Sequence, residues 1–334
     1  MREEQNGGME KIGLFFMIGK VYSEKAVQKF KVLDGRNTVM AKTKRRWGDR
    51  RDGRWVRDVT GLQCVMTNLM PNRTDCEVCL SDKFDVTELV KYLEQKNASH
   101  PDYKTTLFHC ILVAVARMVR ERNYLNRFIQ GRRTYERDEI TLSFVAKRRF
   151  ADGADEALMV LNAKDDDTLD TVSRRIVGDI RETRKSEHST GGIDSAVDAF
   201  AKIPRLLLMF AIRVIRWLDF WGLVPRALTD GDPNYTTVLL SNLGSIKCPA
   251  VYHHLNNYGT NSIMVTIGTL HKEELIMEDG TKQVRDVVDF CATLDERIAD
   301  GFYFARSLKL IRHIFAHPEM LDKPIGEPSG FEYK

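Results

Sequence analysis

Apolar and polar residues recur with two different periods along the chain, and these periods predict a mixture of helices and strands. The clearest helix is expected at 105–123, because its apolar residues return every three or four positions. Other helices are expected at 85–95, 168–187 and 301–316, and the last of them ends before Pro318, which cannot continue a helix. Segments with strand-like alternation lie between the helices. The predicted strands are 62–68, 76–84, 139–150, 156–162, 236–243, 262–270 and 284–294.

Helices and strands are interspersed over the whole chain, and no internal repeat is visible. Such a mixture favours an α/β domain built as a two-layer sandwich, in which helices pack on a mixed sheet. With 334 residues, the chain is long for one compact domain. The surplus is expected in an N-terminal arm at 1–58, with a helical stretch near 23–33, and in an apolar helical insertion at about 190–230. The folded domain itself is expected at 59–325.

The insertion contains the most apolar segment of the chain. Between Pro204 and Pro225, 15 of the 20 residues are apolar, and a helix of this length would match a bilayer core. Its charged residues fall in one narrow stripe of a helical wheel, and arginines near mid-span are costly in lipid. The stripe consists of Arg205, Arg213, Arg216 and Asp219. We therefore predict an amphipathic helix and leave four interpretations open: burial in the protein's own assembly, a partner subunit, a lid over an acyl pocket, and an interfacial membrane contact through 204–225.

Composition and charge narrow the function classes only slightly. Apolar residues make up 43% of the chain, charged residues 29%, and the formal net charge is +4, which argues against a protein that coats nucleic acid. Positive charge gathers at 42–57, where eight Lys or Arg residues surround Trp47 and Trp55. Because Asp49 and Asp52 interrupt this segment, we favour a solvated loop or a subunit-contact arm over a nucleic-acid site. Contact with the phosphates of a nucleotide-like cofactor lies between these alternatives.

The six cysteines are scattered, which favours a reducing cytoplasm over a disulfide scaffold. Cys76 and Cys79 form a CxxC pair, but a tetrahedral zinc site needs a second pair at similar spacing, and the sequence has none. An offset of three along a strand also directs the two thiols to opposite faces. We therefore expect no metal site.

Three short motifs in the C-terminal third carry the candidate chemistry. They are SNLG at 241–244, IG at 267–268 and DERIADG at 295–301. Together with the helix at 105–123, this ordered set resembles the catalytic domain of the dihydrolipoyl acyltransferases of 2-oxo acid dehydrogenase complexes. It is similar, more distantly, to chloramphenicol acetyltransferase. The resemblance covers roughly residues 60–322.

The resemblance implies the CoA-dependent acyltransferase fold, a homotrimer or higher homo-oligomer, and CoA or acyl-CoA as co-substrate. In that family a histidine takes the proton of a thiol, the thiolate attacks an acyl thioester, and the serine of SNLG stabilises the oxyanion. Carried over to this chain, Ser241 is the oxyanion donor and Asp300 is an architectural ion-pair partner. The matching binding positions are Asn242, Gly244, Arg297 and Gly301. No lipoyl attachment is expected, because too few residues precede Lys25 for a lipoyl domain around it.

The chain departs from the family at the catalytic histidine, whose position holds Glu296. A carboxylate with the ordinary pKa of about 4.3 is a poor base for a thiol of about 8.5, so a catalytic Glu296 would need burial that raises its pKa. The alternative is that Glu296 forms an ion pair and that the thiol-transfer chemistry is lost. A substitute base could come from His253 or His254, since this region lies near the trimer contact in the family. The competing interpretation of the two histidines is a surface or interface pair.

Two functions remain at this stage. The first is a cytoplasmic, trimeric acyltransferase that transfers an acyl group between a CoA or dihydrolipoyl thioester and an unidentified acceptor, with no nucleic-acid partner. The second is a non-catalytic trimeric scaffold or acyl-CoA-binding module that has lost the catalytic histidine.

Overall fold

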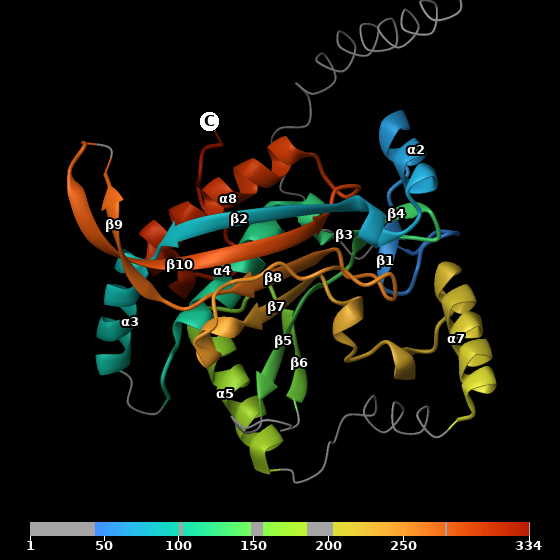
Figure 1. Cartoon of the computed structure of the whole chain (residues 1–334), viewed down its shortest axis with the longest axis horizontal. Helices are drawn as coiled ribbons and strands as arrows, with labels where there is room; N and C mark the ends of the chain where they lie inside the picture. Colours follow the sequence, from blue (N-terminus) through green and yellow to red (C-terminus); the bar gives the residue numbers. More distant parts are fainter. Residues whose placement is uncertain (1–43, 100–102, 148–155, 186–202, 278, 334) are drawn as a thin grey trace, which may run out of the picture. The chain divides into compact units, whose positions relative to one another are not determined.

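The computed structural model describes residues 44–99, 103–147, 156–185, 203–277 and 279–333 (Figure 1). The chain divides into two units, Met1–Lys44 and Arg45–Lys334, and everything below concerns the second unit. The helical stretch predicted near 23–33 lies outside the described residues, and so does the first part of the predicted insertion. Residues 45–58, which we predicted to belong to an N-terminal arm, are part of the second unit.

The described chain forms a seven-stranded mixed sheet (Figure 1). β7 pairs in parallel with both β5 and β8, and the other pairs are antiparallel. β9 (His271–Ile276) pairs with the first half of β10. The main path runs in the order β2 (Glu77–Asp85), β10 (Lys282–Asp295), β8 (Ile263–Ile267), β7 (Val238–Asn242), β5 (Ile140–Lys147) and β6 (Glu156–Ala163).

Four helices cover one face of this sheet. They are α3 (Thr87–Ser99), α4 (Leu107–Glu121), α5 (Leu169–Lys185) and α8 (Gly301–Ala316). Alternate strand residues point toward these helices and form the core with them, because successive side chains of a strand lie on opposite faces. The strand side of the core includes Phe84, Leu142, Val238, Leu240, Ile263, Val265, Val288 and Leu294. The predicted two-layer α/β sandwich is confirmed, and we call the sheet face without helices the open face.

A second, three-stranded sheet lies beside the sandwich. Its order is β1 (Gly53–Trp55), β4 (Arg133–Arg137) and β3 (Arg127–Gln130). Two further helices belong to this region, α2 (Gly61–Leu69) and α7 (Arg205–Phe220). Short 3₁₀ helices complete the described elements: Arg73–Cys76, Asn123–Asn126, Arg226–Leu228, Pro233–Tyr235, Leu243–Ile246 and Pro318–Asp322.

Most predicted elements of the sandwich are confirmed, but the strand predicted at 62–68 is wrong. This segment is α2, and Thr60 caps it in a reciprocal pair of hydrogen bonds with Gln63. Its apolar residues are exposed in the described structure. A short apolar segment of this kind therefore does not indicate a buried strand. Strands β1, β3, β4 and β9 were not predicted, since each is short or rich in charged residues.

Candidate active site

Ser241 lies at the carboxyl end of β7, on the open face. It pairs with Thr266 of β8, which in turn pairs with Cys291 of β10, so the three side chains form one row across the sheet. Ser241 is half-buried. The strand ends here because a 3₁₀ turn begins at Leu243. The predicted position of SNLG at a strand end is therefore confirmed.

Gly244 and Gly268 join two of the motifs physically. A Cβ atom on Gly244 would lie 2.4 Å from the carbonyl oxygen of Gly268, so only glycine allows the two backbones to approach this closely. Thr269, which follows Gly268, donates a hydrogen bond to the carbonyl of Cys248 at 3.1 Å. The SNLG turn is thus fixed against the end of β8, and this contact fixes the backbone next to Ser241.

The third motif is organised around Asp295, which is fully buried. Its carboxylate accepts three hydrogen bonds from Arg297, from Nε at 2.8 Å, from Nη2 at 2.7 Å and from the backbone N–H at 3.1 Å. A second buried guanidinium, that of Arg73, approaches to 3.8 Å. Arg73 also donates to the carbonyls of Asn256 and Gly259, at 2.5 and 3.0 Å. This network ties the motif to the segment that carries His253 and His254.

Burial and charge act differently on the two arginines. Burial lowers the pKa of Arg73, and the charge of Asp295 offsets only part of that effect. Burial also acts to lower the pKa of Arg297, but the hydrogen bond and charge of Asp295 outweigh it and the pKa is raised. The sequence analysis missed both Arg73 and Asp295. Arg73 carries no local signal, because the hydrogen-bond partners of its side chain lie 56 to 186 positions away in the sequence.

Asp300 is exposed and caps the N-terminus of α8. Its side chain accepts a hydrogen bond from the backbone N–H of Tyr303 at 2.7 Å, and Gly301 is the first helical residue. The resemblance implied an ion-pair role for Asp300. In the described structure Asp300 stabilises the start of a helix, while Asp295 forms the buried ion pair of this motif with Arg297.

Glu296 is exposed, next to the buried Arg297. Its backbone N–H donates to the carbonyl of Cys76 at 2.9 Å and continues the pairing of β10 with β2. The described chain therefore does not supply the burial that a catalytic carboxylate would need. Arg297 faces the interior, so its charge is directed away from Glu296.

Ser241 and Glu296 lie at opposite ends of the sheet. From Cys291, in the row of Ser241, the chain runs five residues along β10 and beyond before it reaches Glu296. That is about 16 Å along the strand, and the two strand spacings between β7 and β10 add about 10 Å sideways. The two predicted catalytic groups are therefore about 19 Å apart within one chain, too far to act on the same atom.

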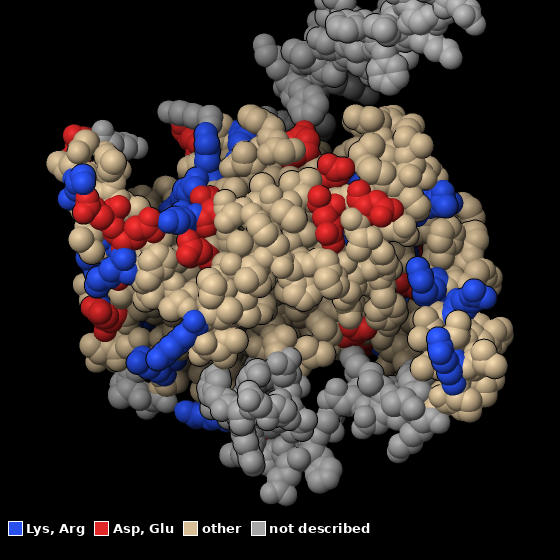
Figure 2. Space-filling view, viewed as in Figure 1, with Lys and Arg blue, Asp and Glu red and all other residues tan. Residues whose placement is uncertain are grey.

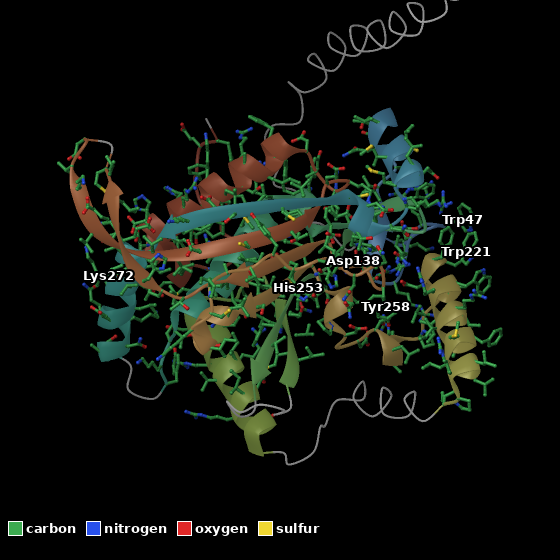
Figure 3. The ribbon with its side chains drawn as sticks, in the orientation of Figure 1. Trp47, Asp138, Trp221, His253, Tyr258 and Lys272 are labelled. Carbon is green, nitrogen blue, oxygen red and sulfur yellow. The ribbon has the colours of Figure 1, made fainter. Side chains whose placement is uncertain are left out.

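His253 and His254 lie between these two ends, on a segment that crosses the open face. The segment starts where Val251 exchanges hydrogen bonds with Thr266, and it ends where the backbone N–H of Leu255 donates to Glu77 Oε1 at 2.6 Å. Both histidines are exposed, and their ring centroids are 4.8 Å apart. Figure 3 shows His253 near the middle of this face. The structure thus places the histidine pair near the sheet face that carries Ser241, with its side chains free to meet another molecule.

The open face is poor in charge around these residues. Figure 2 shows a broad area in the middle of this view without Lys, Arg, Asp or Glu. Val251 and Tyr252, which precede the histidines, are 46% and 53% exposed. An exposed apolar area next to polar catalytic candidates is typical of a surface that another protein subunit covers.

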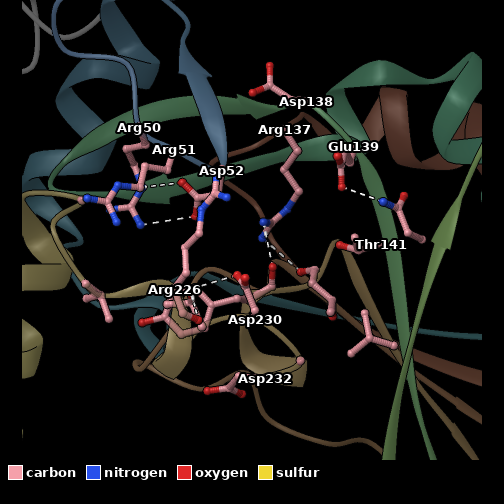
Figure 4. Close-up of a pocket in the computed structure, with 18 of the residues that line it drawn as sticks. Arg50, Arg51, Asp52, Arg137, Asp138, Glu139, Thr141, Arg226, Asp230 and Asp232 are labelled. Carbon is pink, nitrogen blue, oxygen red and sulfur yellow. Dashed lines mark hydrogen bonds and ion pairs between the residues drawn. The ribbon is translucent and has the colours of Figure 1, made fainter. Parts of the chain in front are cut away.

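A separate pocket of about 470 Å³ lies between the start of β5, the segment that follows α7, and the part of the chain rich in Lys and Arg within 42–57, which we call the basic segment (Figure 4). Its charged lining residues include Arg51, Arg137, Glu139, Arg226 and Asp230. Arg137 is buried there and donates to the carbonyls of Tyr235, Thr236 and Thr260, while burial lowers its pKa to about 10. None of the site residues predicted from the sequence lines this pocket.

The two CxxC cysteines have different surroundings. Cys76 is buried, its thiol faces the carbonyls of Met70 and Asn72, and burial raises its pKa to about 11. Cys79 is exposed on β2. Among the described residues, no group of three or more His, Cys, Asp or Glu side chains could hold a metal ion.

Comparisons with solved structures find proteins of similar architecture. A probable dihydrolipoamide acetyltransferase from Listeria monocytogenes 4b F2365 has a TM-score of 0.52, with 17% identity over 83% of this chain and 97% of that chain. The chain has the fold of the dihydrolipoamide acetyltransferases. A second protein with this fold, the dihydrolipoamide acetyltransferase of Azotobacter vinelandii, also has a TM-score of 0.52, with 14% identity over 77% of this chain and 90% of that chain. No protein-family profile and no curated protein matches the sequence.

This acetyltransferase fold confirms the fold class predicted from the three ordered motifs. SNLG, IG and DERIADG lie at the ends of β7, β8 and β10, which are neighbours in the sheet. The signals that the sequence spreads over 60 residues are therefore parts of one structural unit. At these levels of identity, the comparison establishes the fold and leaves the reaction to be inferred from the site.

Proposed function

We propose that this protein is a cytoplasmic acyltransferase that moves an acyl group between a CoA or dihydrolipoyl thioester and a second thiol or small acceptor. The observation that carries the proposal is Ser241, held half-buried at the end of β7 by the contact of Gly244 with Gly268. In the A. vinelandii enzyme a serine, a histidine and an asparagine have roles in the catalytic mechanism. The six free cysteines suit a reducing compartment.

The distance between Ser241 and Glu296 supports a homo-oligomer, and a homotrimer is the form that the resemblance implies. Groups about 19 Å apart within one chain can meet only if one copy supplies Ser241 and its neighbour supplies the other end of the sheet. The exposed apolar area around Val251 and Tyr252 gives such a neighbour a surface to cover. Coverage would also remove water from the exposed carboxylate of Glu296, which is the condition for a carboxylate to act as a base.

The chemistry follows from these positions. A base removes the proton of the acceptor thiol, the thiolate forms a bond to the acyl carbon, and the thioester carbon–sulfur bond breaks as the proton passes to the leaving sulfur. The hydroxyl of Ser241 donates a hydrogen bond to the former carbonyl oxygen of the thioester, which is negatively charged in the tetrahedral intermediate. Glu296, His253 and His254 are the candidate bases, while Asp300, Asn242, Gly244, Arg297 and Gly301 support the site.

A screen of acyl-CoA thioesters against thiol and amine acceptors tests this function. We expect Ser241→Ala to lower kcat about 100-fold, the effect of removing one oxyanion donor. Glu296→Gln, His253→Gln and His254→Gln separate the candidate bases, and Glu296→His restores the residue type of the family. Activity that is unchanged in Ser241→Ala would refute the oxyanion assignment.

One observation favours the second function, a trimeric scaffold or acyl-CoA-binding protein without turnover. Glu296, at the position of the family histidine, is exposed, so the described chain does not bury the carboxylate as a base would require. The ion pair that we expected Glu296 to form in this alternative is not found among the described residues. Calorimetric binding of CoA without release of free thiol, in wild type and in Glu296→His alike, would support this function over the enzymatic one.

A further inference from the structure

The outer face of α7 is an exposed apolar stripe. Leu207, Phe210, Val214, Trp217 and Trp221 follow one another at spacings of three and four, so they share one side of the helix. Phe210, Trp217 and Trp221 are 67%, 60% and 58% exposed. The side next to it, with Leu208, Ala211 and Ile215, is partly covered. Aromatic residues of this size are normally found in protein interiors, so the stripe requires a partner.

The orientation of this stripe is fixed by the C-terminal end of α7. Arg50 forms an ion pair with Asp219 at 3.1 Å and also donates to the Asp219 carbonyl at 2.6 Å, and both side chains are buried. Gln130 donates to the same carboxylate at 2.7 Å. The helix ends at Phe220, and the φ of 71° at the following Gly222 allows the N–H groups of Gly222 and Leu223 to bond back to the last turn. The apolar side is therefore held outward by the fold.

The charge exposed on α7 is entirely positive. Asp219 is the only acidic residue of the helix, and Arg50 neutralises it in the interior. Arg205, Arg213 and Arg216 are exposed, and none of them has an acidic partner among the described residues. Figure 2 shows blue side chains grouped over this part of the surface. Arg213 thus borders the stripe, Arg205 and Arg216 lie on another exposed side of the same helix, and nothing in the described chain compensates these three cations.

Tryptophan is concentrated at this edge of the molecule. Three of the four tryptophans in the chain are largely exposed, namely Trp47, Trp217 and Trp221. Trp47 is 84% exposed and lies three residues before Arg50, the residue that binds the end of α7. Tryptophan favours the boundary between lipid headgroups and acyl chains, because its ring is apolar and its N–H is polar.

We propose that α7 docks on the surface of an anionic phospholipid bilayer, with its axis in the plane of the membrane and its apolar stripe among the upper acyl chains. A helix with Trp, Phe and Leu on its apolar face and arginines on another exposed face has the chemistry of an interfacial helix. A second copy of α7 would bring three further uncompensated arginines against these three, whereas anionic headgroups neutralise them. None of the described helices combines the length and hydrophobicity needed to cross a bilayer, so the helix lies on the membrane.

The test is flotation of the full 334-residue protein with vesicles of phosphatidylcholine that contain about one third phosphatidylserine, and with vesicles of phosphatidylcholine alone. We expect wild type to float with the anionic vesicles and to dissociate as salt is raised. Phe210→Ser combined with Trp217→Ser should lower the partition coefficient about 100-fold, because two large apolar side chains no longer enter the lipid. Arg213→Gln combined with Arg216→Gln should lower it about 30-fold on anionic vesicles only.

Leu62→Ser combined with Leu69→Ser on α2 is the matched control, since both leucines are 72% exposed. This variant should float like wild type. Circular dichroism checks folding, and the arginine variant changes only exposed side chains. The proposal is overturned if wild type does not float with anionic vesicles, or if the Phe210 and Trp217 variant floats equally well. If the Phe210 and Trp217 variant changes its oligomeric state on size exclusion but floats as wild type does, the stripe binds a second copy of the chain and the membrane proposal is wrong.

Discussion

Asp295 offers the sharpest test of how the site is built. Its carboxylate is fully buried and accepts two hydrogen bonds from the guanidinium of Arg297, while Arg73 lies at 3.8 Å. Asp295→Ala would leave two buried guanidinium groups without an acidic partner. Glu296, the next residue, is exposed, and Asp300 is a helix cap. Three carboxylates within six positions of one motif therefore have three different structural roles.

The expected costs follow from those roles. Removing one partner of a buried ion pair costs about 3–5 kcal/mol, so Asp295→Ala should lower the free energy of unfolding by that amount. Loss of an N-cap costs about 0.5–2 kcal/mol, which we expect for Asp300→Ala. Glu296→Ala should change the free energy by less than about 0.5 kcal/mol, as exposed substitutions usually do. Asp295→Asn should fall between the first two values, because it keeps the shape and one acceptor.

Thermal unfolding, followed by circular dichroism at one fixed protein concentration, measures this order. For a chain of this size, about 1 kcal/mol corresponds to roughly 2 °C in Tm, so the expected losses are about 8 °C, 2 °C and less than 1 °C for Asp295, Asp300 and Glu296. The fixed concentration keeps any subunit association constant between variants. If Asp300→Ala lowers Tm more than Asp295→Ala does, Asp300 is the architectural carboxylate after all and the network described above is not what stabilises the motif.

Three further predictions concern other parts of the fold. Burial lowers the pKa of His109 to about 4, so the neutral ring stabilises the fold above pH 6.5 and this stabilisation is lost as the pH falls toward 4. Urea titrations at about pH 6.5 and pH 4 measure the free energy of unfolding at each value. Between the two, His109→Gln should lose about 3 kcal/mol less than wild type. Gly244→Ala should cost about 1–3 kcal/mol in the same assay, because its Cβ would overlap the Gly268 carbonyl, whereas Gly178→Ala in α5 has open space and should be neutral or stabilising. Arg50→Met leaves Asp219 buried and unpaired; we expect faster trypsin cleavage within α7, and an unchanged rate would contradict the anchoring role.

The sequence predicted the sandwich well because its elements obey simple periods. The helix at 105–123 and the strand at 284–294 carry long apolar patterns of the matching period, and the structure has them at Leu107–Glu121 and Lys282–Asp295, buried on more than one side. The small sheet was missed because β4 reads Arg-Thr-Tyr-Glu-Arg, with no apolar alternation. Its arginines are buried through hydrogen bonds to carbonyls, as at Arg137, and a pattern of apolar residues cannot reveal that kind of burial.

The candidate site was predicted in its parts but not in its assembly. The motifs identify Ser241 and Glu296, yet only the strand register shows that they belong to opposite ends of the sheet. Likewise, no local pattern identifies Arg73, because its role depends on contacts with Asn256, Gly259 and Asp295 across the fold. Local motifs report which residue types are present, whereas the distances between them depend on strand pairing that is set by the whole chain.

Two segments lie outside the part of the chain that resembles the family, namely the basic segment within 42–57 and the apolar helix α7. In the structure these two segments contact each other. The basic segment supplies Arg50, the apolar helix supplies Asp219, and their buried ion pair joins them. A solvated basic loop would leave its arginines in water, but Arg50 is 7% exposed and also contacts the aromatic rings of Phe128 and Tyr135. Such a desolvated pair costs free energy unless it is nearly fully hydrogen-bonded, and here it positions one helix with its apolar side outward. The basic segment and α7 therefore form one packed unit that contains none of the candidate site residues. This unit can orient the acyltransferase-type sandwich on another surface without altering those residues.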